Sequence, residues 1–176
     1  MKKFLSCTKT AVVLLIATII WGCAYVYTLA RPISYGMNYE CKTVYDGVEF
    51  EGKLKFDTDG TMLTVNSSFD KGVESRYYCK DGYIFFLLST NDETYKSEIK
   101  EINKNFKEAV KTPFYASKIN AFKMVSEGPD GYSLTYTCKP AIVLAVINAI
   151  ALIALIALTV VSFNFSKKAK CGAESV

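Results

Sequence analysis

The sequence predicts a membrane protein in which two transmembrane α-helices flank one α+β domain. An almost unbroken apolar run extends from Ala141 to Phe163, and nothing ionisable lies between Lys139 and Lys167. As a helix rising about 1.5 Å per residue, this run would reach roughly 35 Å, enough to cross a hydrocarbon core of about 30 Å. A second apolar run extends from Ala11 to Ala30, and strand-like and helix-like patterns fill the chain between them. We expect tails at 1–10 and 164–176, spans at 11–30 and 141–163, and the domain at 31–140.

The first apolar run has two interpretations. A basic leader followed by an apolar stretch that ends in small residues is typical of a signal peptide, here cut after Ala30. The run is longer than the usual signal core of about 7–15 residues, and Trp21, Tyr25 and Tyr27 lie toward one end, as in an interfacial aromatic belt. These features favour a retained transmembrane helix.

The distribution of basic residues predicts the topology. Only Arg31 and Lys139 lie close to the spans on the domain side, whereas six lysines lie in the tails: Lys2, Lys3, Lys9, Lys167, Lys168 and Lys170. We therefore expect a multi-pass protein of the plasma membrane with both termini in the cytoplasm. The net charge of +4 comes from the tails, because the domain itself is close to neutral. The charge thus gives no support for binding nucleic acid.

The start of the domain predicts a β-hairpin that turns at Asp46-Gly47, a pair suited to a type I′ turn. One register gives both an apolar face and a charge-paired face, and a slip of one residue would spoil both. Its pairs are Tyr39 with Leu54, Cys41 with Gly52, Thr43 with Phe50 and Tyr45 with Val48 on one face, and Glu40 with Lys53 and Lys42 with Glu51 on the other.

Further turns at 57–60, 70–72, 81–82 and 127–131 divide the rest of the domain into an antiparallel β-meander of about seven strands with one packed amphipathic helix. The strand from Tyr83 to Ser89 is apolar on both faces, so something should cover its outer side. The helix is the candidate cover, with an apolar stripe, a capping box of Thr90 with Glu93, and a stop at Pro113. The stripe consists of Tyr95, Ile99, Ile102, Phe106 and Val110.

Catalytic and metal-binding sites find little support. The chain has no histidine, and no nucleophile elbow, paired-acid motif or phosphate-binding glycine loop is present, so we expect no enzyme activity, cofactor or metal. Three cysteines, Cys41, Cys79 and Cys138, lie outside the membrane on apolar strand faces, where they are either buried thiols or supply one disulfide of undetermined pairing. Asn66-Ser67-Ser68 matches a glycosylation sequon, although a plain exposed asparagine is favoured.

Two groups of residues are candidates for contacts with a partner. Tyr78 and Phe85 pair across a turn on the outer strand face, where they belong to the seat of the helix, form a partner surface or rest on lipid headgroups. Asn148 lies in the second span beside Ala141, Ala145 and Ala149, whose four-residue spacing lets another helix approach closely. Its amide should face protein, most simply the first span near Gly22, or else a different membrane protein.

Two functional hypotheses follow. The first is a non-enzymatic interaction module, an accessory subunit or a protective, immunity-type protein, whose partners are the lipid bilayer and another membrane or extracytoplasmic protein. The second is an extracytoplasmic ligand-binding or sensory domain that signals through a membrane partner. A closed barrel with an interior pocket would favour the second, and a flat sheet filled by the helix would favour the first.

Overall fold

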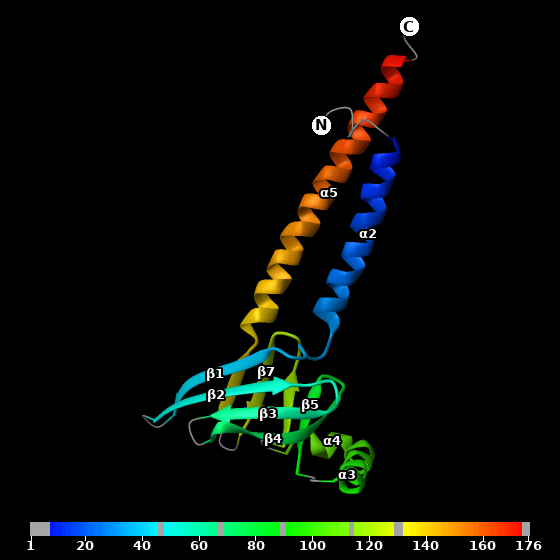
Figure 1. Cartoon of the computed structure of the whole chain (residues 1–176). Helices are drawn as coiled ribbons and strands as arrows, with labels where there is room; N and C mark the ends of the chain where they lie inside the picture. The colour runs from blue at the N-terminus through cyan, green and yellow to red at the C-terminus, as the bar shows by residue number, and fades with distance from the viewer. Residues whose placement is uncertain are drawn as a thin grey trace. The chain divides into compact units, whose positions relative to one another are not determined.

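The computed structural model describes residues 8–45, 48–66, 69–88, 91–112, 115–128 and 132–173 (Figure 1). The chain forms two compact units: Met1–Leu29 with Val143–Val176, and Ala30–Ile142. The predicted Asp46-Gly47 turn, Pro113, Thr90 and the serines of the sequon lie outside the described residues.

The first unit contains two long helices, α2 (Thr8–Ala30) and most of α5 (Lys139–Ala173). By length and composition, both are long and apolar enough to cross a membrane, over Lys9–Ala30 and Lys139–Lys167. The second helix extends beyond the predicted span at both ends, because Lys139-Pro140 forms its first turn, where the missing N–H of a proline is tolerated.

The second unit is a closed antiparallel barrel of eight strands (Figure 1). The strands are β1 (Asn38–Tyr45), β2 (Val48–Phe56), β3 (Thr61–Asn66), β4 (Phe69–Lys80), β5 (Tyr83–Leu87), β6 (Ala116–Ile119), β7 (Lys123–Glu127) and β8 (Ser133–Thr137). Each pairs with the next, and β8 returns to β1 through Glu40 opposite Thr137. The open meander of seven strands is therefore wrong.

The first hairpin has the predicted register. Tyr39 lies opposite Leu54, Cys41 opposite Gly52 and Thr43 opposite Phe50. On the other face Lys42 forms an ion pair with Glu51, and the Lys53 Nζ lies 3.6 Å from a carboxylate oxygen of Glu40. Alternation of apolar and charged residues was sufficient to specify this pairing, because only one face is buried.

The strand that the sequence did not reveal is β6. It is four residues long and pairs with β5 and β7, so it links the two halves of the barrel. Its Ser117 faces the interior opposite Ile84, and its Ala116 packs on the outside against the helix. A short strand with a serine inside and an alanine outside shows no hydrophobic alternation, which is the signal that strand prediction needs.

Large side chains fill the centre of the barrel. Tyr39, Phe56 and Tyr77 form a chain of edge-to-face rings with centroids 5.3 and 5.2 Å apart, and Ile84 and Met124 pack into the same cluster. Eight strands leave an interior just wide enough for such a filling. Burial raises the pKa of Tyr136, also in this cluster, to about 12.

The segment between α2 and β1 closes one end of the barrel. Ile33 and Ser34 are fully buried, and Ile33 belongs to the core cluster. The Ser34 hydroxyl donates to the Ala121 carbonyl at 2.7 Å, and the Tyr39 hydroxyl accepts from the Ser34 amide and donates to the Asn120 carbonyl. These bonds attach the segment to the β6–β7 turn, so it forms part of the domain.

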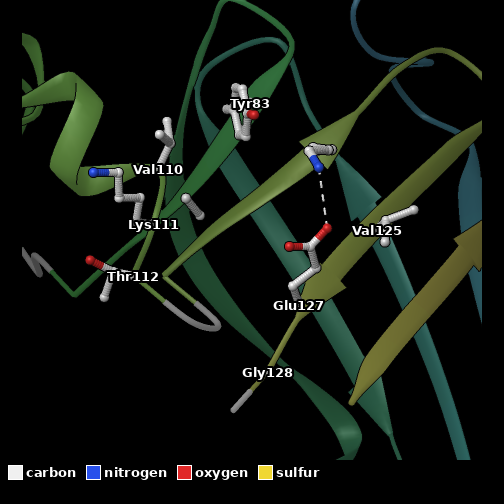
Figure 2. Close-up of a pocket in the computed structure, with 9 residues that line it drawn as sticks. Tyr83, Val110, Lys111, Thr112, Val125, Glu127 and Gly128 are labelled. Atoms are coloured by element: carbon white, nitrogen blue, oxygen red, sulfur yellow. Dashed lines mark hydrogen bonds and ion pairs between the residues drawn. The ribbon is translucent and has the colours of Figure 1, made fainter. Parts of the chain in front are cut away.

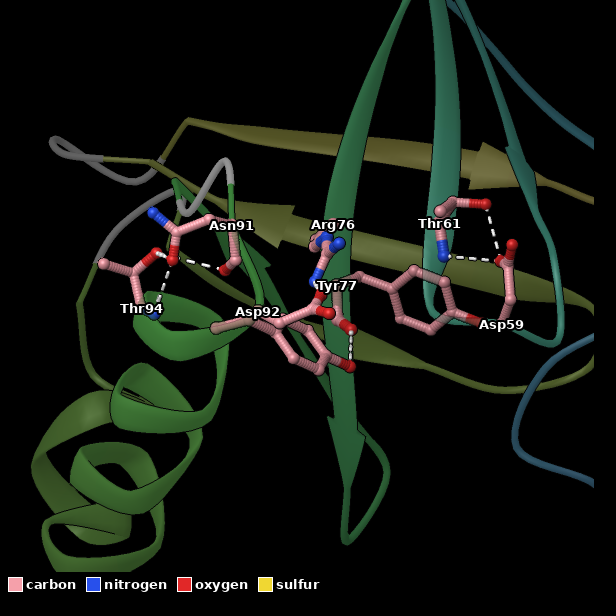
Figure 3. Close-up of polar contacts among 8 residues, drawn as sticks. Asp59, Thr61, Arg76, Tyr77, Asn91, Asp92 and Thr94 are labelled. Carbon is pink, nitrogen blue, oxygen red and sulfur yellow. Dashed lines mark hydrogen bonds and ion pairs between the residues drawn. The ribbon is translucent and has the colours of Figure 1, made fainter.

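The helical cover is broken in two. Helix α3 (Asp92–Lys104) ends at Asn105, whose φ of −117° and ψ of 33° leave the helical region, and α4 (Phe106–Ala109) follows. The N-cap is Asn91, whose side chain accepts from the Thr94 amide at 2.9 Å, and this corrects the predicted capping box of Thr90. Arg76 on β4 donates to Asp92 at 2.7 Å in the first helical turn (Figure 3).

The β4–β5 turn offers a test of the predicted hairpin chemistry. Asp81 and Gly82 both have positive φ, 51° and 78°, as a type I′ turn requires. We expect Gly82→Val to destabilise the domain by about 1–2 kcal/mol, since a β-branched residue is strained there, and Asp81→Asn to be nearly neutral. Urea unfolding of both variants measures the difference, and equal midpoints would contradict this account of the turn.

Candidate functional site

The outer face of β5 is covered by the helices. Phe85 is fully buried and makes edge-to-face contacts with Phe106 and Tyr115, at centroid distances of 5.9 Å each. Tyr78 stacks on Phe85 and is half-buried. The cluster on this face also includes Leu87, Ile102 and Ala116, with Ile99 and Val110 packed against it.

This packing confirms the helix as the cover of β5. It also corrects the interpretation of Phe85 as part of a partner surface, because the side chain is inaccessible while α3 and α4 are in place. Tyr78 keeps an exposed edge, where its hydroxyl lies 3.3 Å from the Asn103 side chain. A strand that is apolar on both faces needs cover inside and outside, and this chain supplies both.

A groove lies beside the covered face, between the end of α4 and the outer faces of β6 and β7 (Figure 2). It encloses about 380 Å³. Its apolar lining comes from Tyr83, Val110, Ala116 and Val125, and its polar lining from Lys111, Thr112, Lys118 and Glu127. The break at Asn105 shapes this groove, because a continuous helix would direct residues 106–110 elsewhere.

Both lysines that line the groove form ion pairs. The Lys118 Nζ lies 3.2 Å from a Glu127 carboxylate oxygen across the β6–β7 pair (Figure 2). The Lys111 Nζ lies 3.1 Å from a Glu108 carboxylate oxygen. The hydrogen bond from Lys118 to Glu127 raises the pKa of the lysine. Both pairs are exposed, so each contributes little to stability and can exchange partners easily.

The three cysteines of the domain are free thiols, and Cys41 and Cys138 are buried while Cys79 is half-buried. All three belong to, or pack against, the interior cluster, as their places on apolar strand faces predict. Burial raises the pKa of each thiol, which keeps it protonated and unreactive. Among the described residues, no group of three or more histidine, cysteine, aspartate or glutamate side chains could hold a metal ion.

The two long helices contact each other through two of the predicted residues, Gly22 and Asn148, and through others that were not predicted. The Thr18 and Thr159 hydroxyl oxygens lie 3.0 Å apart, and the Trp21 ring nitrogen donates to the backbone carbonyl of Asn148 at 3.4 Å. A Cβ atom on Gly22 would lie 3.9 Å from Leu152, so the predicted approach at Gly22 is observed with a different partner residue.

The Asn148 side chain does not bridge the helices. Its amide donates one hydrogen bond to the Leu144 carbonyl of its own helix at 2.9 Å. Ala145 is buried and Ala149 half-buried, whereas Ala141 packs into the barrel core. The Asn148 backbone carbonyl does meet the first helix, and the prediction that its side chain faces protein stays a prediction.

The sequence analysis missed the polar residues of this helix pair. Thr159, Ser162 and Ser166 are all buried. Together with Asn148, Leu152 and Leu155, they recur at alternating spacings of four and three residues, the pattern of a left-handed helix pair. That spacing is readable in the sequence.

The threonine pair gives a quantitative test. Each hydroxyl also lies 2.8 Å from a carbonyl of its own helix, Leu14 for Thr18 and Leu155 for Thr159, so only one can donate across at a time. We expect a double-mutant cycle of Thr18→Val and Thr159→Val to give a coupling of about 0.6 kcal/mol, and less than about 2 kcal/mol. Disulfide formation between cysteines at Gly22 and Leu152 measures it, and a larger coupling would contradict this geometry.

Comparisons of the chain with protein families, with curated proteins and with solved structures found no match. The function is therefore argued from the residues and contacts above.

Proposed function

We propose that this chain is a non-enzymatic, two-span protein of the plasma membrane, with both termini in the cytoplasm and a barrel domain outside that acts as an interaction module. The first helix is retained as an anchor. The proposed partner is another membrane or extracytoplasmic protein, and the groove beside α4 is the proposed contact. An accessory subunit and an immunity-type protein are both consistent with this role.

One observation carries the proposal: a concave, partly apolar groove lies on the outside of a barrel whose centre is filled with its own side chains. Val125, Ala116 and Val110 supply apolar area, and Tyr83 adds an aromatic ring with a polar tip. The pairs of Lys118 with Glu127 and Lys111 with Glu108 stand at the rim. An apolar floor with a charged rim is the usual anatomy of a protein interface.

Site-specific photocrosslinking in native membranes tests the contact. A photoreactive residue at Val125, inside the groove, should give a crosslinked species of one defined mass. A matched probe at Val44, which is exposed on β1, should not. The crosslink at Val125 should weaken when Lys118→Glu places two acids together at the rim. Equal crosslinking from both probes, or none from Val125, would contradict the proposal.

The topology has its own test. A cysteine at Val44 should react with a membrane-impermeant maleimide on intact cells, whereas the native Cys171 should react only after permeabilisation. The intact mass of the membrane-extracted protein should include the first helix. A chain that begins at Arg31 would contradict the retained anchor, and labelling of Cys171 on intact cells would contradict the proposed orientation.

A specific observation favours the second function, ligand binding. At the end of the barrel away from the 31–37 segment, the interior-facing Phe50, Phe86 and Leu134 are only partly buried. Near them, the buried Ser117 hydroxyl has no hydrogen-bond partner among the described residues. Mouths of barrels with apolar walls and a few polar groups are common ligand sites.

Native mass spectrometry of the detergent-extracted full chain tests this alternative. A bound ligand would give an adduct of fixed mass, which Ser117→Ala should weaken because the hydroxyl is removed. Tyr83→Phe, on the outside of the barrel, should leave the adduct unchanged. Absence of any adduct from the parent chain would contradict ligand binding at this end.

A further inference from the structure

Two guanidinium nitrogens of Arg31 are buried without an acceptor among the described residues. Arg31 directly follows Ala30, the last residue of α2. Its Nε and Nη2 atoms are buried, and neither has a hydrogen-bond partner within the part of the chain that the structure describes. A guanidinium is always charged and has only donors, so burying it without an acceptor is unfavourable. An acceptor from outside the described residues would remove this cost.

The position of Arg31 in the domain follows from its electrostatic neighbours. Burial raises the pKa of the Tyr39 hydroxyl and of the Cys138 thiol, and the positive charge of Arg31 opposes both shifts. The guanidinium is therefore close to Cys138, the residue before Lys139. The hydrogen bonds of Ser34 and Tyr39 to the β6–β7 turn hold this end of the barrel together.

Lys139 adds a second cation at the same end. Its side chain is 74% exposed, and its Nζ lies 4.0 Å from a carboxylate oxygen of Glu40. The same carboxylate also lies 3.6 Å from the Nζ of Lys53. One acid is thus shared by two lysines, and no carboxylate in the described part of the chain pairs with Arg31, which leaves this end of the barrel with an excess of positive charge.

We propose that Arg31 and Lys139 bind the phosphate of an anionic glycerophospholipid in the outer leaflet. This inference rests on the proposed membrane placement, because each residue adjoins the end of an apolar helix and so lies at headgroup depth. Because the Nε and Nη2 of Arg31 are buried, the side chain must turn toward the headgroups before its fork can bind phosphate oxygens, whereas the exposed lysine contributes a point charge. A choline headgroup would be disfavoured, because its quaternary ammonium would approach the second cation.

The aromatic residues at this end are consistent with a lipid surface. Tyr35, four residues after Arg31, is 41% exposed, and Phe122 in the β6–β7 turn is half-buried. The Phe122 carbonyl accepts from the Cys138 amide at 2.7 Å, which ties this turn to the start of α5. Aromatic side chains are enriched at the level of lipid headgroups.

Lipid competition in nanodiscs tests the proposal on the full chain. The parent chain would be placed in nanodiscs of phosphatidylcholine mixed with phosphatidylglycerol. Native mass spectrometry would then count the lipids that stay bound to the protein after it is released from the nanodisc. We expect the parent to retain phosphatidylglycerol preferentially. Arg31→Gln should reduce the preference about tenfold, the loss of one charged hydrogen bond, and Lys139→Gln less. Arg31→Lys should retain part of it, since the charge remains without the fork.

The controls separate this site from general charge and from misfolding. Lys100→Gln, on the exposed face of α3, should leave the preference unchanged. Cys41 and Cys138 should stay protected from maleimide in every variant, which shows that the barrel is folded. If Arg31→Gln loses this protection, the variant Arg31→Lys decides instead. The proposal would then be overturned if both Arg31→Lys and Lys139→Gln kept the lipid preference of the parent chain.

The remaining outcomes are distinct. No preference in the parent chain, or an equal preference in parent and Arg31→Gln, would overturn the lipid site while leaving the membrane placement intact. Displacement of the lipid by millimolar inorganic phosphate, with phosphate binding in detergent alone, would identify a free-anion site and overturn the lipid assignment. Release of the chain from membranes by alkaline carbonate would overturn the membrane placement and the lipid site together.

Discussion

Phe85→Ala is expected to destabilise the barrel domain by about 3–5 kcal/mol, the usual cost of removing a buried phenylalanine. Phe85 is fully buried and contacts two rings that follow the helix break, Phe106 from α4 and Tyr115, the residue before β6. The substitution leaves a cavity beneath the helices that a rigid sheet cannot fill. Loss of this ring should also loosen α4 and deform the groove.

The barrel contains its own reporters for this measurement. Cys41 and Cys138 are buried and far apart in sequence, so pulse labelling in urea reports unfolding of the domain within the full chain in detergent. Cys79 would be kept, and the cysteines outside the barrel domain would be replaced by serine. Leu88→Ala is the control, since that side chain is 87% exposed and should change stability by less than about 0.5 kcal/mol. Similar urea midpoints for the two variants would show that the helices do not cover Phe85.

Tyr39→Phe is expected to cost about 1–3 kcal/mol, although only one oxygen atom is removed. That oxygen accepts from the Ser34 amide at 2.9 Å and donates to the Asn120 carbonyl at 3.0 Å. Both backbone groups then lose a partner at a place where Ser34 is fully buried. The 31–37 segment should detach more readily from the barrel end, and Cys138 should become accessible before Cys41.

Tyr83→Phe is the matched control for this second prediction, because its hydroxyl makes no hydrogen bond among the residues that the structure describes. It should behave as the parent chain does in the same labelling assay. Equal effects of Tyr39→Phe and Tyr83→Phe would mean that the segment between α2 and β1 does not depend on the Tyr39 hydroxyl. Hydrogen exchange at the Ser34 amide would check the same contact directly.

Several features of the domain were predictable because they depend on local pattern. The β1–β2 register followed from alternation of residues such as Tyr39 and Glu40, since one face is buried and the other is solvated. The Asp81-Gly82 turn followed from its positive-φ tolerance. The need for a cover over Phe85 followed from apolar residues on both faces of its strand, and the amphipathic stripe from Tyr95 to Val110 identified the cover.

Features that depend on contacts between distant segments were not predictable. Closure between β1 and β8 joins residues almost a hundred positions apart, and no local pattern distinguishes a closed barrel from an open meander. The groove depends on a helix break at Asn105, which ordinary helix propensity does not mark. In the sequence, Arg31 is a basic residue beside a predicted span and indicates only the topology. The fold shows that two of its guanidinium nitrogens are buried without an acceptor among the described residues.

The sequence by itself determined the two apolar helices, the near-neutral domain between them and the pairing of its first hairpin. Length, charge and alternation are local quantities that the chain carries whatever its fold. The tertiary structure alone decided that the strands close into a barrel, that Phe85 is covered, that Asn148 bonds within its own helix and that Thr18 meets Thr159. Each of these depends on which of several available partners lies closest, and that choice is made only when the whole chain packs.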